Sequence, residues 1–189
     1  EIQDEEQFTQ AIMDASVFVA EGLLVTFGIV PSTPETGYGY IQTGEELVGN
    51  GFKVAAFVEK PELLVAEQYL QDGGYLWNSG MFIFKASTYL QELEKFRPDI
   101  YECCSIAVEN ADVDLDFIRV NEEIFSRCPQ DSIDYAIMEK TELGIVIPID
   151  AGWSDVGSWS MLWNISDKDN LGNSTHGDAL LHNCNDNYI

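Results

Sequence analysis

The sequence predicts an α/β fold of three layers, with helices on both faces of a mixed sheet whose strands are mostly parallel. Strand patterns and helix patterns alternate along the chain with short connections, which is typical of strand–helix–strand units. The strand patterns are apolar at consecutive positions, as expected of strands buried on both faces. With 46% hydrophobic residues in a chain of 189, one globular domain is the simplest expectation.

The N-terminal part predicts a helix followed by strands. Apolar residues recur at helical spacing in residues 4–20, and Gly22 then ends the helix. Residues 23–30 are apolar and rich in β-branched side chains, which predicts a buried strand. Two glycines in residues 34–41 indicate a loop that leads into a strand, and residues 53–58 form the next strand pattern.

The middle of the chain predicts helices separated by one short strand. Pro61 favours a helix start, because proline is well tolerated in the first turn. Apolar spacing and capping residues indicate the elements that follow. In order, they are a helix at 62–71, a strand at 80–84 and helices at 87–96, 99–110 and 114–127.

The last predicted elements are a strand at residues 145–149 and, after a Gly- and Trp-rich loop, a short helix at residues 158–165. Residues 170–189 are polar, rich in Asn and Gly, and end within a strand-like pattern. We therefore expect residues 1–166 to belong to the main domain and residues 167–189 to begin a connecting β segment.

The charge balance narrows the classes of partner. The chain has 33 acidic and 9 basic residues, for a formal net charge of -24. Such a charge repels the phosphate backbone of nucleic acids and anionic membrane surfaces, so neither is an expected partner. An anionic small molecule remains compatible, since a metal ion and a few lysines can reverse the sign of the field within one cleft.

The four cysteines are not arranged as C-x-x-C pairs, which favours reduced thiols. Glu21 and Gly22 interrupt the longest apolar stretch, so it falls short of the roughly 20 residues that a membrane helix needs. The first residues are acidic and do not follow the pattern of a secretory signal. We therefore expect a cytoplasmic protein.

Two clusters place special residues next to apolar runs, where ligands bind in open α/β sheets. In the first, Tyr38 and Gly39 lie in a glycine-containing loop, which a tight turn before an edge strand explains equally well. In the second, Glu59 and Lys60 end a strand. Glu59 can accept hydrogen bonds from two sugar hydroxyls, and Lys60 can meet a phosphate as a point charge. The alternative is an exposed ion pair of little energetic value.

Two further clusters carry an amide and a carboxylate. Asn78 offers both a donor and an acceptor to a hydroxyl, whereas the neighbouring Trp77 is better explained as a core residue. Asp155 lies between a strand and a helix, where its carboxylate is suited to holding magnesium. A helix N-cap is the rival role for Asp155, but Ser158 is an equally good cap.

Two other groups of residues, a pair of histidines and the segment around residues 132–140, have simpler explanations. His176 and His182 have no third ligand at metal spacing, which favours surface histidines. Residues 132–135, with Glu139 and Lys140, are compatible with a capped helix that carries a surface charge pair.

Six segments follow one another along the chain: LVTFGI (24–29), PETGYGYI (34–41), FVEKP (57–61), WNSGMF (77–82), SIDYA with MEK (132–140) and GWSDVGSW (152–159). In this order they resemble the bacterial mannose-1-phosphate guanylyltransferases, a family of sugar-1-phosphate nucleotidyltransferases. Each segment alone is a weak signal, but six in sequence cover nearly the whole chain and are specific.

The resemblance implies a GT-A-like nucleotidyltransferase fold. It also implies a reaction in which mannose 1-phosphate attacks the α-phosphorus of GTP, giving GDP-mannose and pyrophosphate. The substrate is then the nucleophile, and catalysis depends on alignment and on charge neutralisation by Mg²⁺ and lysine. The implied catalytic residues are Lys60 and Asp155, with Asp155 as the metal ligand.

The resemblance also implies the substrate contacts. In this assignment Tyr38 and Gly39 line the sugar pocket, Glu59 and Asn78 bind mannose hydroxyls, Lys60 binds the phosphate, and Asp134 supports the sugar side. We expect Glu59, Lys60, Asn78 and Asp155 to converge at one rim of the sheet.

The chain departs from the family at the nucleotide. Family members bind it with a Gly-rich loop containing Arg and Lys, and no segment of this chain corresponds to that loop. We therefore expect an N-terminally truncated domain that does not transfer guanylyl groups alone. We also expect an exposed apolar sheet edge, and hence a homo-oligomer.

Two alternatives remain open. The first is another sugar-1-phosphate nucleotidyltransferase, acting on glucose or N-acetylglucosamine phosphate with UTP or dTTP. The second is a sugar-phosphate-binding module without catalytic activity.

Overall fold

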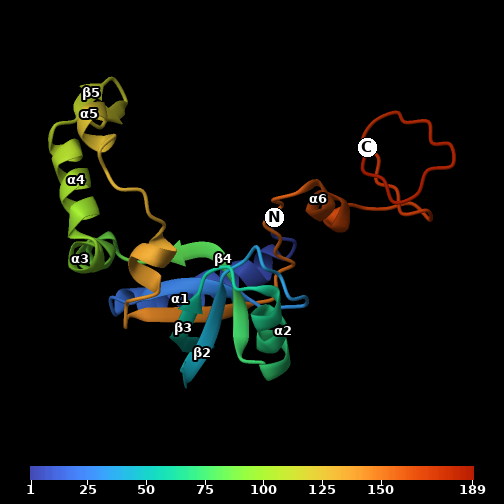
Figure 1. Cartoon of the computed structure of the whole chain (residues 1–189), viewed down its shortest axis with the longest axis horizontal. Coiled ribbons are helices and arrows are strands. Elements are labelled where there is room, and N and C mark those ends of the chain that lie inside the picture. The colour runs from blue at the N-terminus through green and yellow to red at the C-terminus, as the bar shows by residue number, and fades with distance from the viewer. The chain divides into compact units, whose positions relative to one another are not determined.

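The computed structural model describes all 189 residues, which form two compact units (Figure 1). One unit comprises Thr9–Ile149 and contains the sheet. The other combines Glu1–Phe8 with Asp150–Ile189.

The helices are α1 (Glu5–Ala20), α2 (Leu63–Asp72), α3 (Ala86–Phe96), α4 (Pro98–Glu109), α5 (Glu122–Phe125) and α6 (Trp159–Ile165), and a π-helical turn η1 spans Asp134–Met138. The strands are β1 (Leu24–Ile29), β2 (Tyr40–Leu47), β3 (Gly51–Val58), β4 (Tyr75–Ile83), β5 (Asp112–Asp114), β6 (Phe117–Arg119) and β7 (Gly144–Ile149). Most of the predicted helices and strands are therefore confirmed.

Five strands close into a barrel in the order β1-β4-β2-β3-β7. The predicted mixed sheet is confirmed, but only β1 and β7 run parallel, and the other pairs are antiparallel. Within this chain, the expectation of mostly parallel strands is wrong. The reason is local for β2 and β3, because residues 48–50 join them directly and a parallel pair needs a longer crossover.

Barrel closure also removes the sheet edge that the sequence led us to expect. Strand β3 reaches β7 through the pairs Phe52–Val146 and Lys53–Ile145, so each of the five strands has two neighbours. Self-association stays a prediction, without the sheet edge as its cause.

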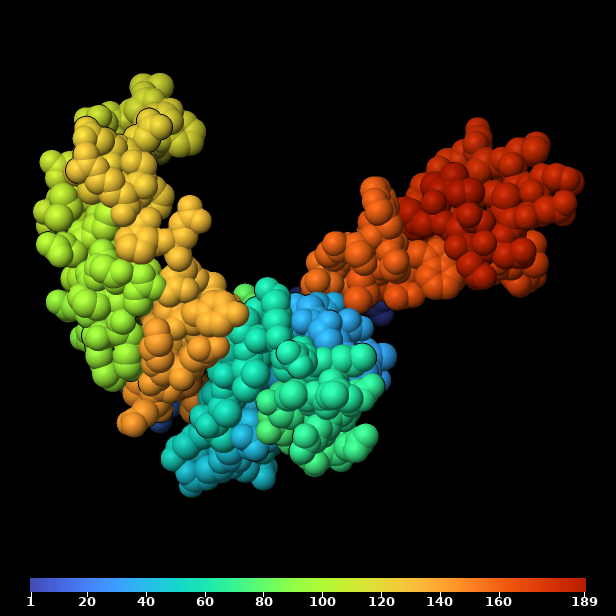
Figure 2. Space-filling model, in the orientation of Figure 1, coloured from blue at the N-terminus to red at the C-terminus, as the bar shows by residue number.

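The core of the sheet unit is built on β1, all six residues of which are buried, as the apolar run predicted. Leu24, Ile41 and Val146 are fully buried there, together with Ile137 of η1. The space-filling view in Figure 2 shows α2 on the strands beside it. Strand β1 therefore forms the centre of this core, with β4 and β7 as its neighbours.

The helix predicted at residues 114–127 is wrong. The segment forms the β5–β6 hairpin and only the short helix α5. Leu115 turns the hairpin with a φ of 55°, and aspartates flank it, a residue type that favours turns. Helix α5 begins after Asn121, whose side chain accepts a hydrogen bond from the Ile124 backbone N–H.

The unit of residues 1–8 and 150–189 is held by its own contacts. The N-terminal ammonium donates to the Ser154 carbonyl at 2.6 Å, and the Trp163 indole donates to the Gly172 carbonyl at 2.7 Å. The predicted β pattern of the tail is limited to one bridge between Ser174 and Tyr188. The role of residues 167–189 as a connecting segment stays a prediction.

None of the helices combines the length and the apolar character required to cross a membrane.

All four cysteines are free thiols, and the Sγ atoms of Cys104 and Cys128 lie 3.8 Å apart.

Candidate functional site

The sheet unit brings together residues from three of the predicted clusters and from η1. A Cβ atom built on Gly39 would lie 2.5 Å from Glu59 Oε2 and 3.4 Å from the Cβ of Asn78. The Asn78 amide Nδ2 in turn donates to Asp134 Oδ1 at 3.0 Å. Gly39, Glu59, Asn78 and Asp134 are therefore neighbours, although 95 positions separate the first from the last in sequence.

Glu59 and Lys60 follow the end of β3. Their charged groups form an ion pair of 3.1 Å, in which the Glu59 side chain is only 11% exposed and that of Lys60 is 60% exposed. The hydrogen bond and charge of Glu59 raise the pKa of the Lys60 ammonium, so this lysine stays protonated at neutral pH. Lys60 has a φ of 47°, a left-handed conformation that is uncommon outside glycine and often found at functional positions. The pair therefore joins a shielded acceptor to an accessible cation.

Asn78 lies where β4 departs from regular pairing with β1. Thr26 faces Phe82 and Gly28 faces Asn78, so three residues of β4 stand opposite one of β1. This is a β-bulge, a feature that re-aims side chains and is frequent next to active sites. The Asn78 backbone N–H donates to the Gly39 carbonyl at 2.8 Å, which ties the bulge to the start of β2.

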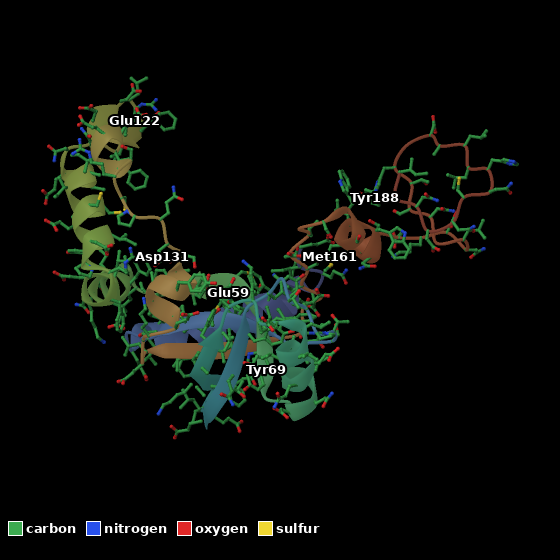
Figure 3. All side chains as sticks on the ribbon, viewed as in Figure 1. Glu59, Tyr69, Glu122, Asp131, Met161 and Tyr188 are labelled. Carbon is green, nitrogen blue, oxygen red and sulfur yellow. The ribbon has the colours of Figure 1, made fainter.

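Asp134 is the first residue of η1, and Glu59 beside it is labelled in Figure 3. Burial raises the pKa of the Asp134 carboxyl, and the charge of Glu59 raises it further. The sequence predicted a capped helix here. The Ser132 hydroxyl does accept from the Tyr135 N–H at 3.4 Å, but the turn is π-helical.

Glu139 is exposed, and its carboxyl group is coupled electrostatically to those of the site. It was expected to form a surface charge pair with Lys140. Burial raises the pKa of the Glu139 carboxyl, Lys140 opposes that rise, and the charges of Glu59 and Asp134 add to it. The cause is the π-helical turn, in which the Glu139 N–H bonds to the Asp134 carbonyl at 3.0 Å, five positions earlier. An α-helical spacing rule does not bring these two residues together.

The charges around the site set what it can bind. Three carboxyl groups, those of Glu59, Asp134 and Glu139, influence one another, and Lys60 forms an ion pair with Glu59. Carboxylate oxygens and an amide suit sugar hydroxyls, and Lys60 suits one phosphate. A doubly charged phosphate would need further positive charge to bind tightly.

Tyr38 and Trp77 form an aromatic pair next to these residues in sequence. Their rings meet edge to face, with centroids 5.2 Å apart. Trp77 is buried, as predicted for a core residue, and its indole Nε1 has no hydrogen-bond partner. A cavity of about 380 Å³ in the same unit, lined by Tyr69 and Tyr75 among others, includes none of the predicted site residues in its lining.

Asp155 belongs to the other compact unit. It is exposed, and its Oδ1 accepts a hydrogen bond from the Gly157 N–H at 3.3 Å. Ser158 caps α6 by accepting from the Met161 N–H at 3.2 Å, which confirms that the cap does not require Asp155. No group of three or more His, Cys, Asp or Glu residues is arranged to hold a metal ion. The magnesium role of Asp155 and its convergence with Glu59, Lys60 and Asn78 stay predictions.

Comparison with known proteins gives relatives along the whole chain. The mannose-1-phosphate guanylyltransferase of Salmonella montevideo is 57% identical over 194 residues, covering 100% of this chain and 41% of that protein. The mannose-1-phosphate guanylyltransferase of Escherichia coli (strain K12) is 53% identical over 192 residues, covering 100% of this chain and 40% of that protein. The chain therefore spans about two fifths of the length of the curated relatives it matches.

Two solved structures share the fold. A crystal structure from Thermus thermophilus, described as a mannose-1-phosphate geranyltransferase, has a TM-score of 0.81 and 31% identity, covering 94% of this chain and 50% of that one. A crystal structure of mannose-6-phosphate isomerase from Helicobacter pylori has a TM-score of 0.75 and 34% identity, covering 82% of this chain and 60% of that one. The predicted α/β fold is thus confirmed. Because the family model described as nucleotidyl transferase also matches residues 2–171, the chain belongs to the nucleotidyl transferase family.

Proposed function

We propose that this chain forms the sugar-phosphate side of a mannose-1-phosphate guanylyltransferase, which makes GDP-mannose and pyrophosphate from mannose 1-phosphate and GTP. The observation that carries the proposal is the meeting of Glu59, Lys60, Asn78 and Asp134 around Gly39. Relatives that align with the whole chain at 53–57% identity bear the name of this activity.

The residues of this site would bind and align the nucleophile. Glu59 accepts hydrogen bonds from mannose hydroxyls, Asn78 contacts a sugar oxygen, and Lys60 meets the phosphate. A phosphate oxygen of mannose 1-phosphate then forms a bond to the α-phosphorus of GTP, and the bond from that phosphorus to the bridging oxygen breaks. Pyrophosphate leaves with the bonding electrons, so no covalent enzyme intermediate is needed. Alignment alone is able to supply a large part of such a rate acceleration.

The acidic surroundings of Lys60 imply that a cation assists the reaction. Magnesium, when bound, would offset the charge of the phosphates. We propose Asp155 as one of its ligands, because an exposed carboxylate suits a hard cation that takes one or two carboxylates and completes its shell with phosphate oxygens and water. A cytoplasmic location and a homo-oligomeric state remain part of the proposal.

Titration calorimetry of the 189-residue chain with mannose 1-phosphate and with mannose tests the proposal. We expect Lys60→Ala to weaken binding of mannose 1-phosphate about tenfold or more, the equivalent of one charge-assisted hydrogen bond, and to leave mannose binding unchanged. Lys53→Ala is the matched control, since Lys53 is an exposed lysine of β3, the strand that Lys60 follows, and it pairs with Glu45 at 2.6 Å.

Equal effects of the two substitutions would contradict the phosphate role of Lys60. Tighter binding of glucose 1-phosphate or N-acetylglucosamine 1-phosphate than of mannose 1-phosphate would favour another sugar-1-phosphate nucleotidyltransferase.

A further inference from the structure

The β4 bulge leaves the Asn78 side chain little freedom. The bulge residues Ser79 and Gly80 are fixed by the Ser79 hydroxyl, which donates to the Phe27 carbonyl at 2.6 Å, and by the left-handed φ of 72° at Gly80. The Asn78 backbone is tied to Gly39 on its other side. The direction of its carboxamide is therefore set by the fold.

The oxygen of this carboxamide faces inward. Asn78 Oδ1 accepts a hydrogen bond from the Gly80 backbone N–H at 3.2 Å. Because a backbone N–H is only a donor, the atom that faces it must be the oxygen and not the amide nitrogen. The Thr26 hydroxyl approaches the same Oδ1 at 3.3 Å and is shared with the Met81 carbonyl at 3.2 Å.

The amide nitrogen therefore faces the site. One of its two N–H groups donates to Asp134, which leaves the other for a ligand. The sequence suggested that Asn78 offers both a donor and an acceptor. The structure commits the acceptor to the bulge and leaves the donor.

Thr26 has no other evident reason to be polar. It is fully buried in β1, among the apolar residues Val25 and Phe27. A buried hydroxyl is costly unless it is hydrogen-bonded, and valine has nearly the same shape and a higher preference for such a position. The hydroxyl is therefore explained by the acceptors that it reaches in the bulge.

We propose that Thr26 is a positioning residue of this site: from buried strand β1, its hydroxyl helps to hold the Asn78 oxygen in the bulge, so that Asn78 meets its ligand only as a hydrogen-bond donor. The inference rests on the proposed function for the identity of the ligand, a sugar phosphate. It specifies that the group opposite Asn78 accepts a hydrogen bond, as a hydroxyl oxygen does.

The test compares Thr26→Val with Thr26→Ser in the 189-residue chain. The first measurement needs no ligand: the side-chain amide signals of Asn78 in ¹⁵N NMR spectra, assigned by their loss in Asn78→Asp. We expect Thr26→Val to shift these signals and Thr26→Ser to keep them close to those of the original chain. The second measurement is calorimetric affinity for mannose 1-phosphate. We expect Thr26→Val to weaken it about threefold to tenfold, the loss of one neutral hydrogen bond, and Thr26→Ser to restore it.

Unchanged Asn78 signals in Thr26→Val would overturn the proposal, and so would equal losses of affinity in the valine and serine variants. Thermal unfolding of both variants shows whether a loss of affinity comes from loss of the fold. Failure of the unsubstituted chain to bind any sugar phosphate would instead refute the proposed function. In that case the NMR comparison still decides whether Thr26 holds Asn78.

Discussion

Adding one methyl group at Gly39 is expected to separate binding from stability. The new Cβ atom would lie 2.5 Å from Glu59 Oε2, too close for any real contact. The other neighbours, Asn78 Cβ at 3.4 Å and Phe57 Cε1 at 3.5 Å, are at ordinary van der Waals distances. The clash therefore falls on the Glu59 carboxylate.

The size of the effect follows from this geometry. Glu59 Oε2 must retreat by about 0.9 Å to reach an ordinary contact of 3.4 Å. The same carboxylate holds Lys60 at 3.1 Å, so both proposed ligand contacts move together. Misplacement by about 1 Å can cost roughly 100-fold in a positioned reaction, and we expect affinity for mannose 1-phosphate to fall at least tenfold. Gly39 does not use a left-handed backbone conformation, and alanine restricts the unfolded chain, so the free energy of unfolding should change by less than about 1 kcal/mol.

Calorimetry and urea unfolding of Gly39→Ala measure the two effects separately. The matched control is Gly37→Ala in the same loop, where a Cβ atom would meet nothing within 4 Å. We expect the control to bind like the unsubstituted chain. Unchanged affinity in Gly39→Ala, or a loss of stability as large as that of a core substitution, would refute the reasoning.

Three further predictions concern stability. Burial raises the pKa of the Asp134 carboxyl above its ordinary value of 3.8, so the folded chain loses stability as the pH rises from 3.8 through the raised pKa. At neutral pH, Asp134→Asn should therefore unfold at a higher urea concentration than the original chain, and no difference there would contradict the prediction. Below pH 3.8 the variant should have no such advantage. Gly28→Ala would place a Cβ atom 2.6 Å from Leu76 Cδ1 and 2.8 Å from Val146 Cγ2. The substitution should lower the free energy of unfolding, measured in urea, by at least about 1–3 kcal/mol, and a smaller loss would show that the neighbouring side chains shift to make room. Ser158→Ala removes the cap of α6 and should destabilise this helix by about 1 kcal/mol in amide hydrogen exchange, with Ser160→Ala inside the helix as the control that leaves exchange nearly unchanged.

The sequence predicted those parts of the fold whose signals are local. Residues 23–30 formed the expected buried strand because a continuous apolar, β-branched run fits few other environments. Residues 114–127 were wrongly expected to be helical, because the hairpin depends on a left-handed Leu115 that no spacing rule signals. Strand directions were also misjudged. The short connection between β2 and β3 was a local sign of an antiparallel pair, whereas the other antiparallel pairs join strands far apart in sequence.

The site was predictable to a similar degree. Glu59, Lys60 and Asn78 were found because each lies at the end or bend of a strand pattern, and the structure places Gly39, Glu59 and Asn78 together. Thr26 was missed because a threonine in an apolar strand is also an ordinary β-branched residue. The electrostatic coupling of Glu139 to Asp134 was missed because the π-helical turn follows no simple spacing rule.

The π-helical turn η1 makes the length of its segment critical. In this turn the Glu139 N–H reaches the Asp134 carbonyl five positions earlier. An α-helix rotates by about 100° per residue, so removing one residue would restore the regular repeat and leave the two residues four positions apart, still on one face of the helix. Inserting one residue would leave them six positions apart and turn the carboxyl groups away from each other. Homologous chains should therefore tolerate the loss of one residue here better than a gain, and ligand affinity measured across single insertions and deletions would reveal the difference.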